Sequence, residues 1–458
     1  MSYCETINYL YNLQKYGIKF GLDNIVKLTS ALENPHESFT SAHVAGTNGK
    51  GSTSAVIASI LKAAGLKVGL FTSPHLVSFT ERIRVNGEEI TEGEVVSLTE
   101  EIRDKMRSEP VELSPTFFEV VTAMALLYFK RKRIDIAVIE VGMGGRLDAT
   151  NIITPDVSVI TNINYDHMNF LGNTLKEIAH EKAGIIKDGI PVVISSQVPE
   201  VLEVIEERAE ERNAGVYLYG RDFSSVLKRE DLSGIYFDYR SDSFEIHDLY
   251  LSLAGEHQMQ NASVAIKTVE LISEKIAGQE CSPYRDRWGF LTPPNNFIIR
   301  EGLKNVRWLG RLEIINDEPP ILIDGAHNPA AAEALSNTLL KSFLWEYKKI
   351  ILILGIMDDK DIRGIMKPLL PLASEIILTA PDYKRAAPPA KLAGIAASLG
   401  FPDVHIAPTV KDAIELAKNI CQQSAVGSHL IVVTGSFYTI GEVNEVLGHK
   451  GVLTRLRE

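Results

Sequence analysis

The sequence predicts an α/β protein of two domains, each built on a mainly parallel sheet that helices cover. Three observations lead to this prediction. The chain has 458 residues, enough for two or three domains, and its 45% hydrophobic and 23% charged residues are ordinary for a globular protein. Apolar runs of strand length alternate with segments of helical period. The loop signal T-P-P-N-N, at Thr292–Asn296, interrupts this alternation, so we expect domains at 1–296 and 297–458.

In the first domain, the apolar runs predict strands at 40–45, 67–71, 134–141, 157–161 and 191–195, with helices at 52–64 and 174–186. Thr91 and Glu94 have the spacing of a capping box, in which the two residues satisfy backbone N–H groups at a helix start. Asn86 and Gly87 form the residue pair of a tight hairpin turn. The alternating polarity of 223–253 predicts a small antiparallel patch late in this domain.

In the second domain, strands are expected at 321–323, 350–354, 375–379, 404–407 and 430–434, with helices between them. Asn328 and Pro329 suit the cap and the first turn of the helix that follows the first of these strands. Both halves therefore have the same class of fold. No internal repeat relates the two halves.

Composition excludes several classes of protein. Lys and Arg total 47 against 59 Asp and Glu, a net charge of −12, which disfavours nucleic acid as a partner. The longest apolar run, near 350–354, is far shorter than the roughly 20 residues that span a bilayer, and the N-terminus has no secretory signal. Three separated cysteines fit a reducing compartment. We therefore expect a cytoplasmic protein, acting as a monomer, with neither a membrane nor a nucleic-acid partner.

The strongest local motif is H-V-A-G-T-N-G-K-G-S, from His43 to Ser52. It follows a strand and opens a helix, so small residues let backbone N–H groups and a helix N-terminus surround an anion. Lys50 would balance phosphate charge, and Ser52 could reach Mg²⁺. The spacing departs from the common phosphate-loop pattern, because two residues separate the first glycines and Gly51 follows Lys50. Two interpretations of the motif remain at this point: a distinct variant of the phosphate loop, or a simple glycine-rich turn.

A second motif, E-V-G-M-G-G-R-L-D-A-T-N, begins at Glu140, at the end of a predicted strand. Open α/β sheets place ligands there, so Glu140 could hold a metal ion that the phosphate loop shares. Gly142 and Gly144 suggest a dinucleotide fingerprint, but position 147 is Leu where that pattern needs its third glycine. A nicotinamide dehydrogenase is therefore disfavoured.

Weaker motifs leave alternatives open. His167, in Y-D-H-M-N-F-L-G, could be a metal ligand or a structural histidine. Lys182, in E-K-A-G-I, reads by itself as a solvated helix residue. T-S-P-H-L, starting at Thr72, could be only a proline-containing loop. In the second half, Asp324 ends a strand where a carboxylate suits ribose or base contacts, while Arg311 and the segment T-G-S-F-Y are individually weak signals.

Together and in this order, these motifs resemble the folylpolyglutamate synthase and dihydrofolate synthase family of the Mur ligase superfamily. The resemblance runs from Y-G-I-K-F-G-L-D, at 16–23, to T-G-S-F-Y, at 434–438. It implies an N-terminal domain of phosphate-loop type and a Rossmann-like C-terminal domain. It also explains the unusual loop, because G-T-N-G-K-G-S is the form typical of this superfamily.

The resemblance further implies roles for individual residues. ATP and its phosphates would be bound by Thr47, Asn48, Gly49, Lys50, Gly51, Ser52, Asn261, Arg311 and Asp324. Two magnesium sites would draw on Ser52, Ser73, Glu140 and His167. The pterin segments would be Thr116, Phe117, Phe118, Glu119, Leu147, Asp148 and Ala149, with His327 and Ser436 for the incoming glutamate. Lys182 matches a lysine that the family carbamoylates, so the catalytic set would be Lys50, Lys182 and His167.

The implied reaction is the ATP-dependent addition of L-glutamate to dihydropteroate or to the γ-carboxylate of folates, through an acyl phosphate. Asp148 followed by Ala149 is typical of the bifunctional bacterial members. Three alternatives remain from the sequence: a folylpolyglutamate synthase without dihydrofolate synthase activity, a nucleotide-hydrolysing switch that makes no ligation product, and a catalytically inactive binding module. The last is disfavoured because each motif keeps its polar residues.

Overall fold

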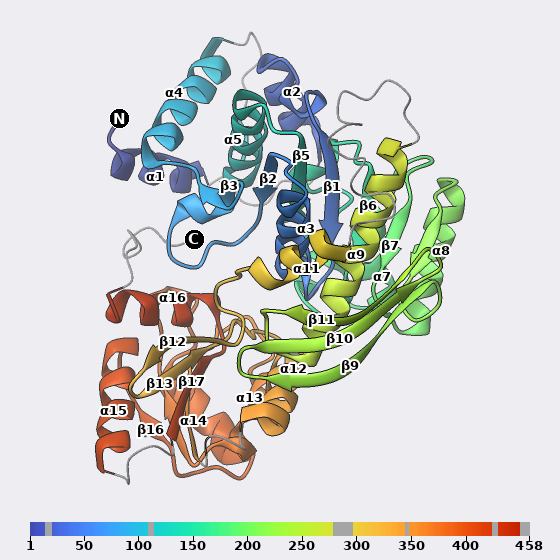
Figure 1. The fold of residues 1–458 in the computed structure, drawn as a ribbon. Coiled ribbons are helices and arrows are strands. Elements are labelled where there is room, and N and C mark those ends of the chain that lie inside the picture. The colour runs from blue at the N-terminus through green and yellow to red at the C-terminus, as the bar shows by residue number, and fades with distance from the viewer. Residues whose placement is uncertain are drawn as a thin grey trace.

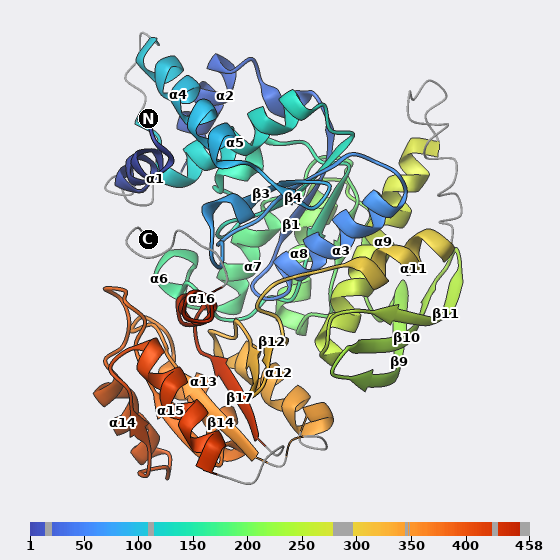
Figure 2. The ribbon, with the colours of Figure 1, turned by 60° about the vertical axis from the view of Figure 1, so that its left-hand side comes forward.

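The computed structural model describes residues 1–13, 21–108, 114–277, 296–343, 347, 349–423 and 429–448. It confirms a two-part α/β fold with sheets of eight, three and six strands. Figure 1 shows the eight-stranded sheet and its helices above the six-stranded sheet and its helices, and Figure 2 shows the same stacking after a turn of 60°. No helix within the described ranges is long and apolar enough to cross a membrane.

The eight-stranded sheet is parallel apart from the hairpin at one edge. Its spatial order is β4 (Glu88–Glu89), β3 (Ile83–Val85), β2 (Val68–Phe71), β5 (Ile136–Glu140), β1 (Thr40–Ala45), β6 (Val157–Ile160), β7 (Val192–Ile194) and β8 (Val216–Leu218). The central strands are buried along their length, as expected when helices cover both faces of a parallel sheet. The predicted Asn86–Gly87 turn joins β3 to β4, and Thr91 and Glu94 make the predicted reciprocal capping bonds.

Helices pack on both faces of this sheet. On one face lie α3 (Lys50–Ala63), α9 (Glu256–Ala277) and α11 (Asn296–Asn305), which share a single apolar core with the strands. On the other lie α1 (Tyr3–Asn12), α2 (Asp23–Ala31), α4 (Glu92–Ser108) and α5 (Phe117–Lys132), with α7 (Leu175–Ala183) and α8 (Pro199–Glu211) farther along the sheet. Gly302 allows α11 to approach α3, because a Cβ there would lie 2.5 Å from the Cα of Ile60.

The expected antiparallel patch is confirmed as β9 (Phe223–Asp231), β10 (Gly234–Ser241) and β11 (Glu245–Leu251). Along β10, Ile235, Phe237 and Tyr239 are fully buried at every second position. They join the core that contains α3 and α9, so the patch extends that face of the first domain.

The six-stranded sheet has the order β12 (Glu313–Asp317), β13 (Pro320–Ile323), β17 (His429–Thr434), β14 (Lys349–Leu354), β15 (Glu375–Leu378) and β16 (His405–Ile406). Only β12 is antiparallel to its neighbour. Separate apolar cores on its two faces are formed with α12 (Pro329–Thr338), α13 (Ile362–Leu369) and α14 (Pro389–Ser398), and with α15 (Val410–Gln423) and α16 (Phe437–Val446). Asn328 caps α12 as predicted, accepting the Ala331 N–H at 2.9 Å.

The division between 296 and 297 stays a prediction, and the packing of α11 bears on it. This helix begins at Asn296, yet its buried Ile298, Ile299 and Leu303 join the core of the eight-stranded sheet. A loop signal marks where a helix starts but not which sheet its apolar face will cover. Residues 292–295 of that signal lie outside the described residues, as do 16–20 of the N-terminal motif.

Candidate active site

Three polar segments of the first domain lie at the carboxyl ends of neighbouring parallel strands. Residues 46–50 follow β1, Glu140 ends β5, and residues 162–167 follow β6. They face the second domain across a cavity of about 390 Å³. Its lining includes every residue predicted to hold nucleotide or metal, and Lys182: Thr47, Asn48, Gly49, Lys50, Gly51, Ser52, Ser73, Glu140, His167, Lys182, Asn261, Arg311 and Asp324.

A second cavity, of about 580 Å³, lies beside the first. It is lined by all nine residues predicted to bind pterin or glutamate: Thr116, Phe117, Phe118, Glu119, Leu147, Asp148, Ala149, His327 and Ser436. The two cavities share Ser73, Pro74, residues 142–144, His167, His327 and Phe437. The fold thus brings the predicted groups together, while the individual roles stay predictions.

The glycine-rich loop is held tightly against β6 and the segment that follows it. Gly46 has φ 149°, and a Cβ there would lie 1.8 Å from the Oγ1 of Thr161. The N–H groups of Thr47 and Asn48 both donate to the carbonyl of Asn162, at 2.9 and 3.2 Å. Helix α3 then begins at Lys50, so its first N–H groups, which have no partner within a helix, are directed toward the loop. This is an anion site of helix N-terminal type.

Two ammonium groups bind the same carbonyl oxygen of this loop. Lys50 Nζ donates to the carbonyls of Gly46 and Thr47, each at 3.1 Å, and Lys182 Nζ donates to the Gly46 carbonyl at 2.7 Å. Lys182 is only 4% exposed, and burial together with the charge of Lys50 lowers its pKa to about 7. The simple reading of Lys182 as a solvated helix residue is therefore wrong. Helical period could not reveal that the end of α7 packs against the phosphate loop.

The four predicted metal ligands have polar atoms suited to a hard cation. Burial raises the pKa of Glu140 to about 7, although the charge of Lys50 and the Ser73 N–H, 3.2 Å from Glu140 Oε2, act in the opposite direction. Partial burial and the charges of Lys360 and Lys50 lower the pKa of His167 to about 4, so its imidazole is neutral at pH 7. Within the described ranges, no three His, Cys, Asp or Glu side chains gather closely enough to hold a metal ion by themselves.

Two contacts across the domain junction were not predicted. The side chains of Asn48 and Asn328 exchange hydrogen bonds of 3.3 and 2.9 Å, which ties the phosphate loop to the cap of α12. Asp166 binds Lys360 Nζ at 2.7 Å and lies 3.7 Å from His327 Nε2. The sequence placed Asp166 in a motif and Asn328 at a helix cap, but a residue pair separated by 280 or 194 positions carries no local signal.

The charge on Asp166 follows from these neighbours. Burial alone would raise the pKa of this carboxyl. The nearby His327 side chain and the ion pair with Lys360 instead hold its pKa well below its usual range. Asp166 therefore stays ionised and pairs with the second domain throughout the physiological range of pH.

The remaining nucleotide candidates surround the first cavity from both domains. Asn261 Nδ2, on α9, donates to Gln258 Oε1 at 3.0 Å. Arg311 is partly buried, and its guanidinium carbon lies 4.9 Å from the centre of the Phe437 ring. Asp324 accepts backbone N–H groups of Leu312 and Ala326, at 3.1 and 2.9 Å. These bonds keep Asp324 oriented at the end of β13.

The second cavity has an aromatic wall and a basic rim. Phe117 stacks on Tyr11 with ring centres 5.2 Å apart, and the guanidinium of Arg82 lies 5.3 Å from the Phe117 centre. Thr116 and Glu119 form a capping box at the start of α5, which positions that ring. Lining residues that the sequence did not single out include Arg82, Lys360, Tyr383, Lys384 and Arg385, and Tyr438 of the T-G-S-F-Y segment lines the same cavity.

Comparison with known proteins agrees with this geometry. Residues 44–269 match the Mur ligase middle domain, and residues 310–437 match the Mur ligase glutamate ligase domain. A dihydrofolate synthase/folylpolyglutamate synthase of Bacillus subtilis is 35% identical over 97% of this chain and 99% of its own length. The chain belongs to this family of Mur ligases. It is therefore an ATP-dependent ligase.

Other family members extend the comparison. A folylpolyglutamate synthase of Lacticaseibacillus casei is 36% identical over 98% of this chain and 99% of that protein. The Mycobacterium tuberculosis folylpolyglutamate synthase, solved with ADP, has a TM-score of 0.88 at 32% identity and covers 98% of this chain and 100% of that one. Escherichia coli FolC, solved with DHPP and ADP, has a TM-score of 0.82 at 31% identity, with 98% of each chain covered.

The contact between Gly46 and Thr161 makes the loop of this ligase sensitive to a single methyl group. We expect Gly46→Ala to weaken ATP binding by at least about tenfold, because the loop must move from the helix N-terminus that receives the phosphates. Isothermal titration calorimetry with ATP measures the change. Gly93→Ala is the matched control, since a Cβ at Gly93 meets nothing within 4 Å. Equal affinities for the two variants would contradict this account of the loop.

Proposed function

We propose that this ligase adds L-glutamate to dihydropteroate and to the γ-carboxylate of reduced folates. The observation that carries the proposal is the junction of the two cavities at Ser73, residues 142–144 and His167. ATP in the first cavity would bring its γ-phosphate to this junction. An acceptor in the second would bring its carboxylate to the same place, and such alignment supplies much of the rate of a bimolecular transfer.

The nucleotide would lie with its phosphates over the start of α3. Lys50 would turn from the carbonyls of Gly46 and Thr47 to the β- and γ-phosphates, and the free N–H groups of the helix would bind the same oxygens. Asn261, Arg311 and Asp324 would hold the rest of the nucleotide from both domains.

The residues at the junction fit Mg²⁺. Glu140 supplies a buried carboxylate, Ser52 and Ser73 supply hydroxyls, and His167 supplies a neutral imidazole. Magnesium is typically bound by one or two carboxylates, substrate phosphates and water, which agrees with the lack of an all-protein cluster among the described residues. Bound there, in two sites, it would neutralise charge on the transferring phosphoryl group.

The second cavity suits a pterin. Phe117, Phe118, Leu147 and Ala149 offer apolar surface, and the Asp148 carboxylate can accept hydrogen bonds from ring N–H donors. Thr116 and Glu119 hold the aromatic segment in place through their capping box. His327 and Ser436 come from the second domain beside the junction, where the incoming glutamate would bind.

The reaction would proceed in two steps. The acceptor carboxylate attacks the γ-phosphorus and releases ADP, and the resulting acyl phosphate is then attacked by the glutamate amine, which releases phosphate. Lys50 stabilises charge on the transferred group. The Asn48–Asn328 and Asp166–Lys360 contacts hold the domains together over the junction and limit entry of water, which would hydrolyse the acyl phosphate.

Both cavities are lined by residues of a single chain, so a monomer would suffice for catalysis. We also propose a cytoplasmic location. The two cysteines within the described ranges, Cys4 and Cys421, are free thiols, as expected in a reducing compartment.

Replacing Lys50 tests the phosphate-loop assignment. We expect Lys50→Ala to fold normally and to lose on the order of a hundredfold in ligase turnover, because the charge that faces the γ-phosphate is gone. Release of ADP in the presence of acceptor and glutamate is the measurement. Lys62→Ala is the control, since Lys62 is exposed near the end of the same helix. Near wild-type turnover of Lys50→Ala would show that the loop does not serve this reaction.

Acceptor specificity is tested by offering dihydropteroate or tetrahydrofolate, each with ATP and glutamate. We expect ADP release and a glutamylated product with both acceptors, because Asp148 and Ala149 line the predicted pterin cavity. Product release with tetrahydrofolate alone would identify a folylpolyglutamate synthase without dihydrofolate synthase activity. ATP hydrolysis independent of acceptor and glutamate would instead support the nucleotide switch.

We further propose that Lys182 is carbamoylated. With a pKa of about 7, a large share of its amine is neutral at physiological pH, and only the neutral amine attacks CO₂. The ammonium loses one proton to become the neutral amine, and formation of the N–C bond with CO₂ releases a second proton, so a cation is replaced with an anion beside Lys50. That change removes the repulsion between the two ammonium groups at Gly46 and provides two oxygens for magnesium or its waters. The alternative is an unmodified Lys182 that binds a phosphate directly.

The carbamate predicts a specific rescue. We expect Lys182→Ala to lose activity and formate or acetate to restore part of it, while Lys176→Ala, on the exposed side of the same helix, stays active. Electron density at Lys182 should contain three extra atoms. At fixed dissolved CO₂, the modified fraction should rise between pH 6 and 8, since the neutral amine increases as pH passes the pKa. An unmodified amine and no rescue by a carboxylate would support the phosphate contact.

A further inference from the structure

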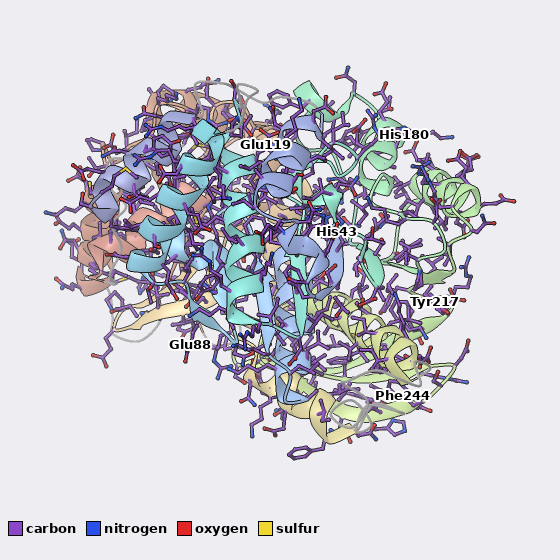
Figure 3. The ribbon with its side chains drawn as sticks, turned by 90° about the horizontal axis from the view of Figure 1, so that it is seen from above. His43, Glu88, Glu119, His180, Tyr217 and Phe244 are labelled. Atoms are coloured by element: carbon purple, nitrogen blue, oxygen red, sulfur yellow. The ribbon has the colours of Figure 1, made fainter. Side chains whose placement is uncertain are left out.

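His43 opens the phosphate-loop motif, yet none of the roles above uses it. It lies on β1, and its side chain is fully buried inside the first domain. Figure 3 labels it together with Glu88 and His180, which are both exposed. Its Nε2 is 2.8 Å from Thr150 Oγ1, and that oxygen is 2.5 Å from Asp148 Oδ1. Thr150 is also fully buried, and Asp148 is 7% exposed. A continuous polar chain therefore joins the strand before the ATP loop to the predicted pterin carboxylate.

The direction of these hydrogen bonds follows from the supply of protons. An ionised Asp148 can only accept, so the single hydroxyl hydrogen of Thr150 points to Asp148 Oδ1. The oxygen of Thr150 must then accept from His43, whose Nε2 therefore carries a hydrogen. Burial lowers the pKa of His43 to about 3, so the ring is neutral and Nδ1 is unprotonated. Among the described residues Nδ1 has no hydrogen-bond partner, which is less costly for a lone pair than for an N–H group.

The chain ends on a carboxylate that needs this support. Burial raises the pKa of Asp148, while hydrogen bonds from Thr150 Oγ1, the Thr150 N–H at 3.0 Å and the Met143 N–H at 2.9 Å act against that rise. These donors also set the orientation of the carboxylate at the wall of the second cavity. The donation from His43 polarises the Thr150 hydroxyl and holds its hydrogen toward Asp148.

We propose that His43 is a positioning residue for acceptor binding, which keeps Asp148 oriented as a hydrogen-bond acceptor through the hydroxyl of Thr150. The proposal rests on the proposed function, in which Asp148 accepts hydrogen bonds from the pterin ring. His43 thereby serves the pterin site although its motif belongs to the ATP site, which lies only three residues farther along the chain.

Four variants test the relay. His43→Leu and Thr150→Val each remove one donor, whereas His43→Gln and Thr150→Ser keep an N–H or O–H group near the same position. We expect the KM for dihydropteroate to rise by about tenfold in the first pair and to stay within about twofold in the second. The KM for ATP should change by less than about twofold in all four. Because both losses break one chain, His43→Leu combined with Thr150→Val should cost little more than either alone.

Several outcomes would overturn the proposal. An equal rise in the KM for ATP would show that His43 only supports the loop. Failure of His43→Gln to restore acceptor binding would show that ring packing, and not the donor, matters. Additive effects on KM in the double variant would show that His43 and Thr150 act independently and not as one hydrogen-bonded chain. Asp148→Ala separates the two hypotheses, because an unchanged KM for dihydropteroate in that variant contradicts the proposed pterin site. If Asp148→Ala raises the KM for dihydropteroate but Thr150→Val leaves it unchanged, only the relay is contradicted.

Discussion

The carbonyl oxygen of Gly46 receives hydrogen bonds from two lysine side chains, and much of the active site depends on this contact. Lys50 and Lys182 reach it from helices that are far apart in the sequence, at 3.1 and 2.7 Å. Two lysine side chains at one oxygen repel each other when both are protonated, which favours the neutral amine of Lys182 and the binding of an anion between them. A triphosphate supplies such an anion, and a carbamate on Lys182 would supply another. The charge of the loop is therefore balanced only when an anion binds there.

The positive charge of the loop lies beside the place where the two cavities meet. Phosphates held by the loop would reach the junction at Ser73 and residues 142–144, and the aromatic cavity opens from the same place. Contacts of Asn48 with Asn328 and of Asp166 with Lys360 bring the second domain over that junction. A ligase that makes an acyl phosphate needs this arrangement, because an activated acyl group survives only where water is kept away.

Local pattern was sufficient for much of the fold. The strand at 40–45, the hairpin at Asn86–Gly87, the antiparallel patch at 223–253 and the cap at Asn328 all depend on neighbours within a few residues, and each is confirmed. The helix at 296–305 shows the limit of such reasoning. The sequence analysis did not identify this helix, and its packing on α3 depends on the close approach at Gly302, which no short-range pattern encodes.

The sequence by itself determined which residue types gather at the strand ends, and through motif resemblance it determined the family. Such motifs can be recognised in a sequence because the backbone geometry of a loop or a helix start depends on only a few neighbouring residues. Only the tertiary structure decided the state of those residues. The burial of Lys182, the pKa of about 7 at Glu140 and the chain from His43 through Thr150 to Asp148 arise from groups brought together across many positions. Desolvation and long-range hydrogen bonds depend on the packed surroundings, which exist only after the chain has folded.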